Sequence, residues 1–122
     1  MEKKAFILFA HGSRDPEWST TFERIYRAIG AASPETRAEL AYLEFTKPSL
    51  QEATARLVGD GYARIVVVPV FLARGGRLKQ DLPLLMDELR QSHPQATFEL
   101  AGAIGEEESV IQAIAAHVLT LK

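Results

Sequence analysis

The chain has 122 residues, of which 47% are hydrophobic and 25% charged, and its formal net charge is −2. This length suits one domain over residues 1–122, and the balanced charge argues against a nucleic-acid partner. Because the sequence contains no cysteine, disulfides, thiolate metal sites and a cysteine nucleophile are excluded, and any metal must be bound by histidine and carboxylate. The apolar run after Lys4 is too short for an export signal or a membrane span, so we expect a cytoplasmic protein with no membrane partner.

The first apolar run, AFILFA at residues 5–10, predicts a strand that is buried on both faces. The polar segment HGSRDP follows it directly at residues 11–16. Ligands bind at the carboxyl ends of the strands in open parallel sheets, which makes His11 the first candidate for chemistry. Its imidazole could accept a proton near neutral pH or bind a divalent cation, and the alternative is a hydrogen-bonded structural histidine.

Asp15 and Pro16 have the form of an N-cap and a first helical residue, and they predict a helix over residues 16–32. The glycine and proline around residues 30–34 end the pattern. Apolar side chains recur in this helix at helical spacing, which we interpret as one core-facing stripe: Trp18, Phe22, Ile25, Tyr26 and Ile29.

The segment at residues 37–45 alternates between two faces and predicts a second strand, with Glu44 close to its end. A carboxylate at that position either caps the following helix or completes a histidine–carboxylate metal site with His11. The next helix is expected over residues 46–59. The GDG at residues 59–61 leads into a strand instead of following one, so we interpret it as a turn and not as a phosphate-binding loop.

Residues 64–72, RIVVVPVFL, give the strongest strand signal, and Pro69 within them indicates either a bulge or the end of regular pairing. The stretch at residues 73–79 carries a glycine pair and three cations, and we expect a loop there. A third helix defined from Leu82 onward precedes a short strand over residues 97–101. A last helix is expected to point four apolar side chains inward: Val110, Ile111, Ile114 and Val118.

This order repeats a strand and a helix four times, which requires crossover connections and predicts an α/β three-layer sandwich: a four-stranded parallel sheet with helices on both faces. With the strand order 2-1-3-4, the first and third strands are neighbours whose outgoing connections run to opposite faces. A ligand crevice opens at such a point. The loops at residues 11–16 and 73–79 would then face each other, with Glu44 beside them.

Four cations lie on these two loops of a slightly acidic chain: Arg14, Arg74, Arg77 and Lys79. A solvated rim is one interpretation. The one we favour is a docking surface for a ligand with several carboxylates or phosphates, which arginine binds in a bidentate manner. The Ser13 hydroxyl has no second histidine near it in the sequence, so we expect it to bond the backbone of its own turn.

Five motifs are spread over nearly the whole chain: HGSRDP, YLEFTKPSL, RIVVVPVFLARGG, KQDLP and AIGEEESV. In this combination they resemble the small sirohydrochlorin cobaltochelatases of the CbiX type, relatives of the sirohydrochlorin ferrochelatases. The resemblance implies a chelatase-like fold, a homodimer, and ATP-independent insertion of cobalt or ferrous iron into sirohydrochlorin, an anionic tetrapyrrole. It also implies that the metal is a substrate and that no organic cofactor is needed.

The family's first active-site histidine corresponds to His11, the implied base and transient metal ligand, and its strand-two glutamate corresponds to Glu44. The position of its second histidine is occupied here by Arg77. A guanidinium has no lone pair for a metal and stays protonated, so it can be neither ligand nor base, although it can hold a substrate carboxylate. The substrate-binding residues expected on this basis are Ser13, Arg14, Arg74, Gly75, Gly76, Arg77 and Lys79.

Two other functions remain open at this point. A paralogue that lost chelation with the second histidine would hold a tetrapyrrole or a metal without catalysis. A small phosphate or nucleotide binder is the least favoured, because the sequence has no glycine-rich strand–turn–helix phosphate loop.

Overall fold

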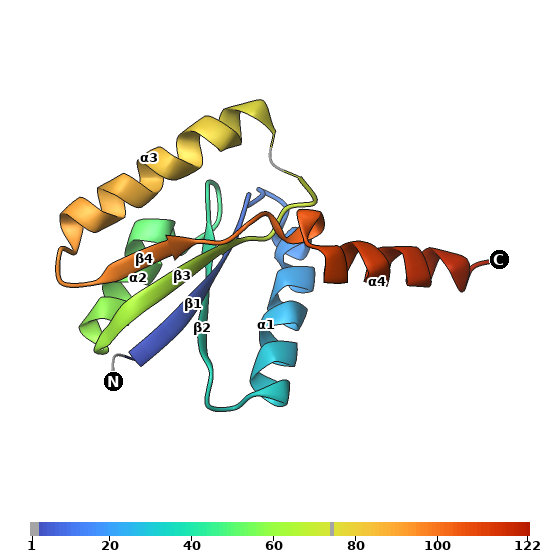
Figure 1. The fold of residues 1–122 in the computed structure, drawn as a ribbon, viewed down its shortest axis with the longest axis horizontal. Helices are drawn as coiled ribbons and strands as arrows, with labels where there is room; N and C mark the ends of the chain where they lie inside the picture. Colours follow the sequence, from blue (N-terminus) through green and yellow to red (C-terminus); the bar gives the residue numbers. More distant parts are fainter. Residues whose placement is uncertain (1–2, 74) are drawn as a thin grey trace.

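The computed structural model describes residues 3–73 and 75–122, and for residue 77 it describes the backbone alone. Strands and helices alternate along the chain (Figure 1), with two short 3-10 helices, η1 and η2, between them. Their bounds are β1 Lys3–Ala10, η1 Pro16–Ser19, α1 Thr20–Ala32, β2 Arg37–Tyr42, α2 Leu50–Gly59, β3 Tyr62–Pro69, α3 Gly76–Ser92, β4 Thr97–Leu100, η2 Ile104–Glu106 and α4 Glu108–Leu119.

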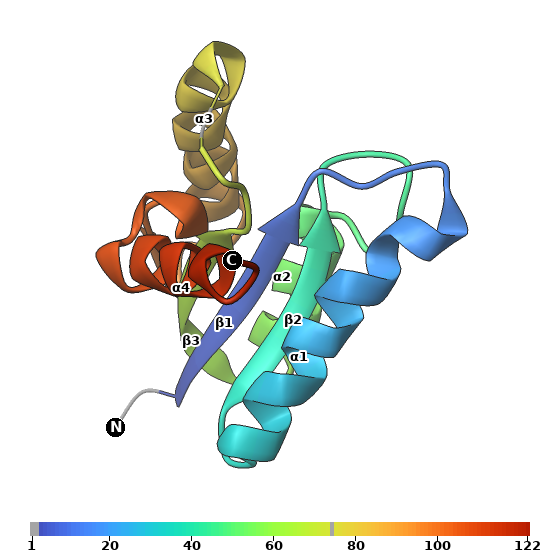
Figure 2. The ribbon, with the colours of Figure 1, turned by 90° about the vertical axis from the view of Figure 1, so that its right-hand side faces the viewer.

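The four strands form one parallel sheet in the order β2-β1-β3-β4, which confirms the predicted order and fold class. In the register of the sheet, Leu8 of β1 pairs with Leu40 on one side and with Val68 on the other. The helices α2 and α3 lie on one face and α1 on the other (Figures 1 and 2). The chain therefore leaves the neighbouring strands β1 and β3 toward opposite faces, as a ligand crevice between them requires.

The core lies between the sheet and the pair α2 and α3. Alternate residues of the strands point to this face, and Ile7 of β1, Leu57 of α2 and Leu82 of α3 are at most 1% exposed there. The same cluster takes in the central strand β3 through Ile65 and Val67. None of the helices in the described part of the chain combines the length and apolar character needed to span a bilayer.

The opposite face is covered less completely. α1 packs against β2, yet none of its residues is buried. The predicted core stripe of this helix is therefore only half right: Trp18, Phe22 and Ile29 are half-buried, whereas Ile25 and Tyr26 are 37% and 41% exposed.

The prediction that α4 points four apolar side chains inward is wrong. The helix projects away from the sheet (Figure 1), and none of its residues is buried. Ile111 and Ile114 are 41% and 45% exposed, and Val118 is 56% exposed. The periodicity of the sequence identified an apolar face correctly, but it does not show whether that face packs against the sheet of the same chain.

Several predicted boundaries also shift. The helix predicted from residue 16 starts with η1, where the Asp15 carboxylate accepts a bond from the Glu17 N–H, and becomes α-helical at Thr20. The second strand ends at Tyr42 instead of residue 45, so Glu44 lies beyond it. The third strand ends at Pro69, as its missing N–H predicts.

The helices α2 and α3 start elsewhere than predicted. α2 begins after Ser49, whose hydroxyl accepts a bond from the Glu52 N–H in a capping box. α3 begins at Gly76, so most of the expected loop at residues 73–79 is its first turn. The glycine pair at residues 75 and 76 indicated a loop, but Gly75 is the N-cap of the helix and Gly76 its first residue.

Candidate functional site

His11 is the first residue after β1 and lies exposed at the carboxyl end of the sheet. Its ring is 4.6 Å from the ring of Phe71, measured between centroids. Phe71 is 7% exposed and packs edgewise against Phe9 of β1, at 6.3 Å. The imidazole is thus seated on the end of the hydrophobic core while it stays open to solvent.

Glu44 is held beside His11 by the backbone. Beyond the end of β2, the Leu43 N–H donates to the carbonyl of Ala10 at 2.9 Å, and the Glu44 N–H donates to the carbonyl of His11 at 3.0 Å. The chain therefore continues alongside the end of β1 for two residues after regular pairing stops. The imidazole and the carboxylate are delivered to one place by this extension.

The loop after His11 crosses the loop that carries Glu44 at very close range. Gly12 has a φ of +92°, and a Cβ atom there would lie 1.8 Å from the carbonyl oxygen of Glu44. The Thr46 hydroxyl accepts a bond from the Ser13 N–H at 3.2 Å and donates to the Ser13 carbonyl at 3.1 Å. Only glycine fits this crossing, and the two loops form one hydrogen-bonded unit.

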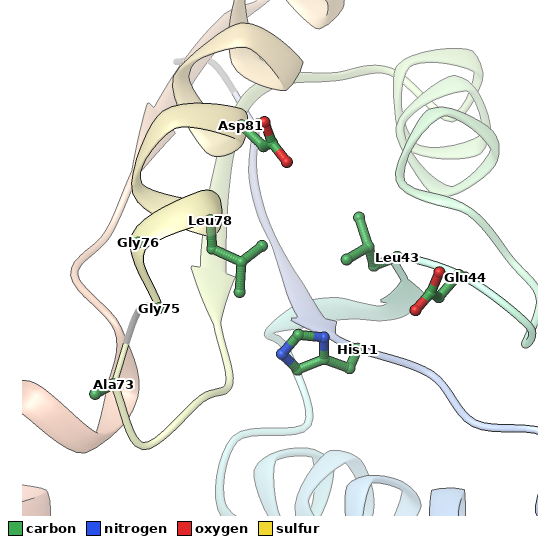
Figure 3. Close-up of a pocket in the computed structure, with 8 residues that line it drawn as sticks. All are labelled: His11, Leu43, Glu44, Ala73, Gly75, Gly76, Leu78 and Asp81. Atoms are coloured by element: carbon green, nitrogen blue, oxygen red, sulfur yellow. The ribbon is translucent and has the colours of Figure 1, made fainter.

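The third wall comes from the connection between β3 and α3 and from the first turns of α3. Together with the two loops it encloses a cavity of about 620 Å³ (Figure 3), within the usual range of small-molecule sites of roughly 300–1,000 Å³. Leu43 and Glu44 line one side and the α3 residues the other, with His11 between them. The lining residues are His11, Leu43, Glu44, Ala73, Gly75, Gly76, Leu78 and Asp81.

The cavity offers one imidazole, from His11, and two carboxyl groups, from Glu44 and Asp81. Within residues 3–73 and 75–122, no group of three or more histidines and acidic residues is placed to hold a metal ion. These donors are therefore spread around the wall and do not form a preformed cage. Such a wall can exchange protons and can lend one nitrogen and one oxygen to an ion that has other ligands.

Of the sequence-predicted site residues, four line this cavity: His11, Glu44, Gly75 and Gly76. Three others lie outside its lining. The Ser13 hydroxyl accepts a bond from the Asp15 N–H within its own turn, and the Arg14 guanidinium lies 4.6 Å from the centre of the Phe45 ring. Lys79 is exposed in the first turn of α3.

The two remaining predicted residues are arginines. Arg74 lies outside the described residues. The backbone of Arg77 belongs to the first turn of α3, between the cavity-lining residues Gly76 and Leu78, and its side chain lies outside the described part.

The sequence reasoning missed four lining residues: Leu43, Ala73, Leu78 and Asp81. Leu78 and Asp81 are three residues apart, so they share a side of α3 once the helix is known to start at Gly76. The motif KQDLP contains Asp81, but we assigned it only to the opening of the third helix. Placing the helix start earlier would have drawn attention to this carboxylate.

The sequence and the fold both resemble those of known proteins. The model of the CbiX family matches residues 5–121. A protein named sirohydrochlorin cobaltochelatase from Saccharolobus solfataricus is 31% identical over 118 residues, covering 92% of this chain and 91% of the relative. A second protein of that name, from Methanopyrus kandleri, is 35% identical over 82 residues, covering 67% of this chain and only 57% of the relative.

The fold recurs in a crystal structure of a CbiX protein from Marinobacter aquaeolei. The two chains are 35% identical, the TM-score is 0.84, and the match covers 96% of this chain and 95% of the other. The family match over almost the whole sequence and this structural likeness agree with each other. The chain belongs to the CbiX family.

Proposed function

We propose that the chain inserts cobalt(II), or alternatively ferrous iron, into sirohydrochlorin without ATP, with the metal as a substrate and no organic cofactor. The names of the relatives support this reaction. The observation that carries the proposal is the exposed imidazole of His11 in a cavity of about 620 Å³ that Glu44 also lines.

The reaction exchanges one dication for two protons. Two pyrrole N–H bonds break, the two protons leave the macrocycle, and four nitrogen–metal bonds form. The total charge of the macrocycle with its bound ion or protons is therefore unchanged. His11 is the base that takes up one pyrrole proton, and the second passes to solvent, because imidazole exchanges protons at neutral pH and this one is open to the cavity. Its seat against Phe71 orients the ring for that role.

His11 and Glu44 also receive the incoming ion. Imidazole nitrogen and carboxylate oxygen suit both cobalt(II) and ferrous iron. Two protein donors leave the other coordination positions to water and then to the pyrrole nitrogens. A site of this kind binds the metal weakly, which favours its release into the macrocycle.

The walls of the cavity suit a flat, anionic ligand. Leu43 and Leu78 present apolar side chains on opposite sides (Figure 3). A Cβ atom at Gly75 or Gly76 would meet no atom within 4 Å, so there is open space in front of this part of the backbone. Arginine binds carboxylates in a bidentate manner, and Arg77 is the residue we assign to a carboxylate of the tetrapyrrole. The predicted contacts of Ser13, Arg14, Arg74 and Lys79 belong to the same proposal.

We further propose that residues 1–122 act as one domain, that two copies form a homodimer, and that the protein works in the cytoplasm. The homodimer is supported by the exposed apolar surface of α4. The other two statements rest on sequence length and composition alone.

The reaction is tested by mixing the purified protein with sirohydrochlorin and cobalt(II) without oxygen, and by following the absorbance change of metallation. We expect a rate well above that of the uncatalysed mixture. Pigment that binds without faster metallation would establish the non-catalytic paralogue instead, and pigment that does not bind at all would overturn both functions.

The role of Arg77 is tested by Arg77→His, which restores an imidazole at the position of the family's second histidine. We expect tighter cobalt(II) binding in calorimetry, because a second nitrogen donor would join His11. An unchanged binding isotherm would contradict the placement of residue 77 beside the metal.

A further inference from the structure

Phe45 has a strained backbone conformation in the loop that carries Glu44. Among residues 3–73 and 75–122 it is the only residue other than glycine with a positive φ, at +67°. The Thr46 N–H donates to the carbonyl of Glu44 at 2.8 Å, so Phe45 is the middle residue of a tight turn. Such a turn with a positive φ at its centre is rare and strained, and glycine would occupy it more easily than a bulky residue. The backbone alone therefore gives no reason for a phenylalanine at this position.

Packing in the core gives no reason either, because Phe45 is 57% exposed. Its ring contacts the Arg14 guanidinium, whose central carbon lies 4.6 Å from the centre of the ring. A cation over an aromatic face within about 6 Å of its centre is attracted by the ring. The strained turn therefore places an aromatic ring under a guanidinium group. Strained residues are concentrated at binding and catalytic sites, which points to a function for this contact.

The backbone fixes both members of this pair. Thr46 directly follows Phe45, and its hydroxyl forms two hydrogen bonds with the backbone of Ser13. Ser13 directly precedes Arg14, so the two loops, which lie side by side at the carboxyl end of the sheet (Figure 2), are joined next to the pair. The crossing that shapes the cavity thus also brings the ring and the guanidinium together.

The nitrogen atoms of Arg14 are available to a ligand. Within the described part of the chain, Arg14 is exposed and forms no hydrogen bond and no ion pair. Arg37 also lies over an aromatic ring, 5.3 Å from the centre of Tyr62, but its guanidinium donates to Glu39 at 2.8 Å and to Asp60 at 2.9 Å. A ring contact uses the face of a guanidinium and leaves the N–H groups, which bind a carboxylate in a bidentate manner. Arg37 is bonded within the fold, whereas Arg14 is held in place with its donors unused.

The pair lies at the border of the cavity. Arg14 is three residues after His11, which lines the cavity, and neither Arg14 nor Phe45 is part of the lining. Phe45 directly follows Glu44, which is part of it. Groups at this place can contact the edge of a bound ligand but not the atoms that react beside His11. The carboxylates of sirohydrochlorin are at its edge, away from the pyrrole nitrogens.

We propose that Phe45 is a positioning residue: its ring holds the Arg14 guanidinium at the border of the cavity, where Arg14 binds a carboxylate at the edge of the tetrapyrrole. This role rests on the proposed function, because the carboxylate belongs to the proposed substrate. The contact is the same before and during metal insertion, so it contributes to substrate binding and not to the chemical step. Loss of either side chain should raise the KM for sirohydrochlorin and leave kcat nearly unchanged.

Binding of metal-free sirohydrochlorin, measured by equilibrium dialysis without oxygen, tests the pair directly. Arg14→Gln should weaken binding by roughly ten- to a hundredfold, as loss of a charge-assisted contact does. Phe45→Gly should weaken it by roughly three- to tenfold, because the guanidinium loses its support. Phe45→Tyr keeps a flat ring and should restore most of that loss. The matched control is Arg24→Gln, which removes an exposed charge on α1 and should bind as the wild-type chain does.

A double variant shows whether Phe45 acts through Arg14. The chain with both Arg14→Gln and Phe45→Gly should bind no more weakly than Arg14→Gln alone, because a positioning residue has no effect once the group that it positions is gone. Losses that multiply would mean that the ring contacts the pigment by itself, against the positioning role. In the metallation assay, each single variant should keep kcat within about twofold of wild type, and a fall in kcat without a change in KM would contradict the proposal.

Thermal unfolding separates this role from a structural one. Phe45→Gly relieves the strained φ, so it should melt at or above the temperature of the wild-type chain although it binds the pigment more weakly. A clearly lower melting temperature would mean that the ring supports the loop, and the assignment would fail. Arg14→Gln protein that binds as tightly as wild type would overturn the carboxylate contact and leave the chelatase function standing, whereas a wild-type chain that binds no sirohydrochlorin would overturn both.

Discussion

The two faces of the sheet differ in how fully the chain covers them. Toward α2 and α3, Ile7, Leu57 and Leu82 are at most 1% exposed. On the other face, α1 has no buried residue. A groove lies beside it, lined by Phe6 and Leu8 of β1 and by Val68 of β3. Both faces are apolar in sequence, because buried parallel strands carry apolar residues on both sides. The difference shows that one chain buries a core on one face and leaves apolar side chains partly exposed on the other.

The candidate site lies where the complete face ends. His11 stacks on Phe71, which packs on Phe9 and so on the core beneath α2 and α3. The Gly105 N–H, just before α4, donates to the carbonyl of the same phenylalanine. The site is therefore built on the fully buried side of the molecule and borders the less covered side.

The largest expected effect comes from deleting a side chain on the covered face. Leu82→Ala should lower the free energy of unfolding by about 2–5 kcal/mol, because it leaves a cavity in a fully buried core. Ile114→Ala on α4 is the matched change, and it should cost less than about 0.5 kcal/mol at concentrations where the chain is monomeric. Equal losses in chemical denaturation would contradict the contrast between the faces.

A change at the loop crossing should have the next largest effect. Gly12→Ala forces an alanine to a φ of +92°, which alone costs about 1–3 kcal/mol, and its Cβ would overlap the carbonyl of Glu44. We expect a lower melting temperature and slower metallation, since His11 and Glu44 would be pushed apart.

The control for that change is Gly59→Ala at the end of α2, where a Cβ atom would meet nothing within 4 Å. This variant should be as stable as the wild-type chain. If Gly12→Ala were equally stable and active, the tight crossing would not position the site.

The smallest expected effect concerns the capping box at the start of α2. The effect is small because the buried side chains of this helix, such as Leu57, contribute most of its stability. The Ser49 backbone N–H donates to the Glu52 carboxylate at 2.9 Å, and this bond lowers the pKa of Glu52 below its usual value. A lowered pKa in the folded state stabilises the fold above the unfolded pKa, and this contribution is lost as the pH falls through the folded pKa. Glu52→Gln should therefore be slightly less stable than wild type at pH 7 and equal to it in acid. A difference that stays constant with pH would argue against the capping bond.

Much of the fold followed from local patterns in the sequence. The apolar run before His11 and the β-branched run before Pro69 placed two strands, and the alternation of strands and helices predicted a parallel sheet. The strand order 2-1-3-4 was adopted as a hypothesis, which the structure confirms. Glu44 was placed near the end of β2, although it lies two residues beyond the strand. The strands themselves depend on neighbours in sequence, which periodicity reports well.

The remainder depends on contacts that a single chain's pattern does not encode. The apolar side chains of α4, such as Ile111 and Ile114, have the spacing of a core face. That spacing does not distinguish a face buried within the chain from one that stays exposed. The glycine pair at residues 75 and 76 indicated a loop, so the first turn of α3 was missed, and with it the place of Asp81 in the cavity. The groove on the α1 side could not be foreseen either, because it depends on the direction in which α4 leaves Gly105.

The central claim is that the imidazole of His11 drives metallation in the cavity at the end of β1. The most direct test compares the rate of cobalt(II) insertion into sirohydrochlorin for the wild-type chain, for His11→Ala and for His93→Ala, whose histidine lies past the far end of α3. We predict that His11→Ala loses at least about 100-fold in rate, as removal of a general base does, while His93→Ala stays close to wild type. A folded His11→Ala protein that metallates sirohydrochlorin as fast as wild type would contradict the account.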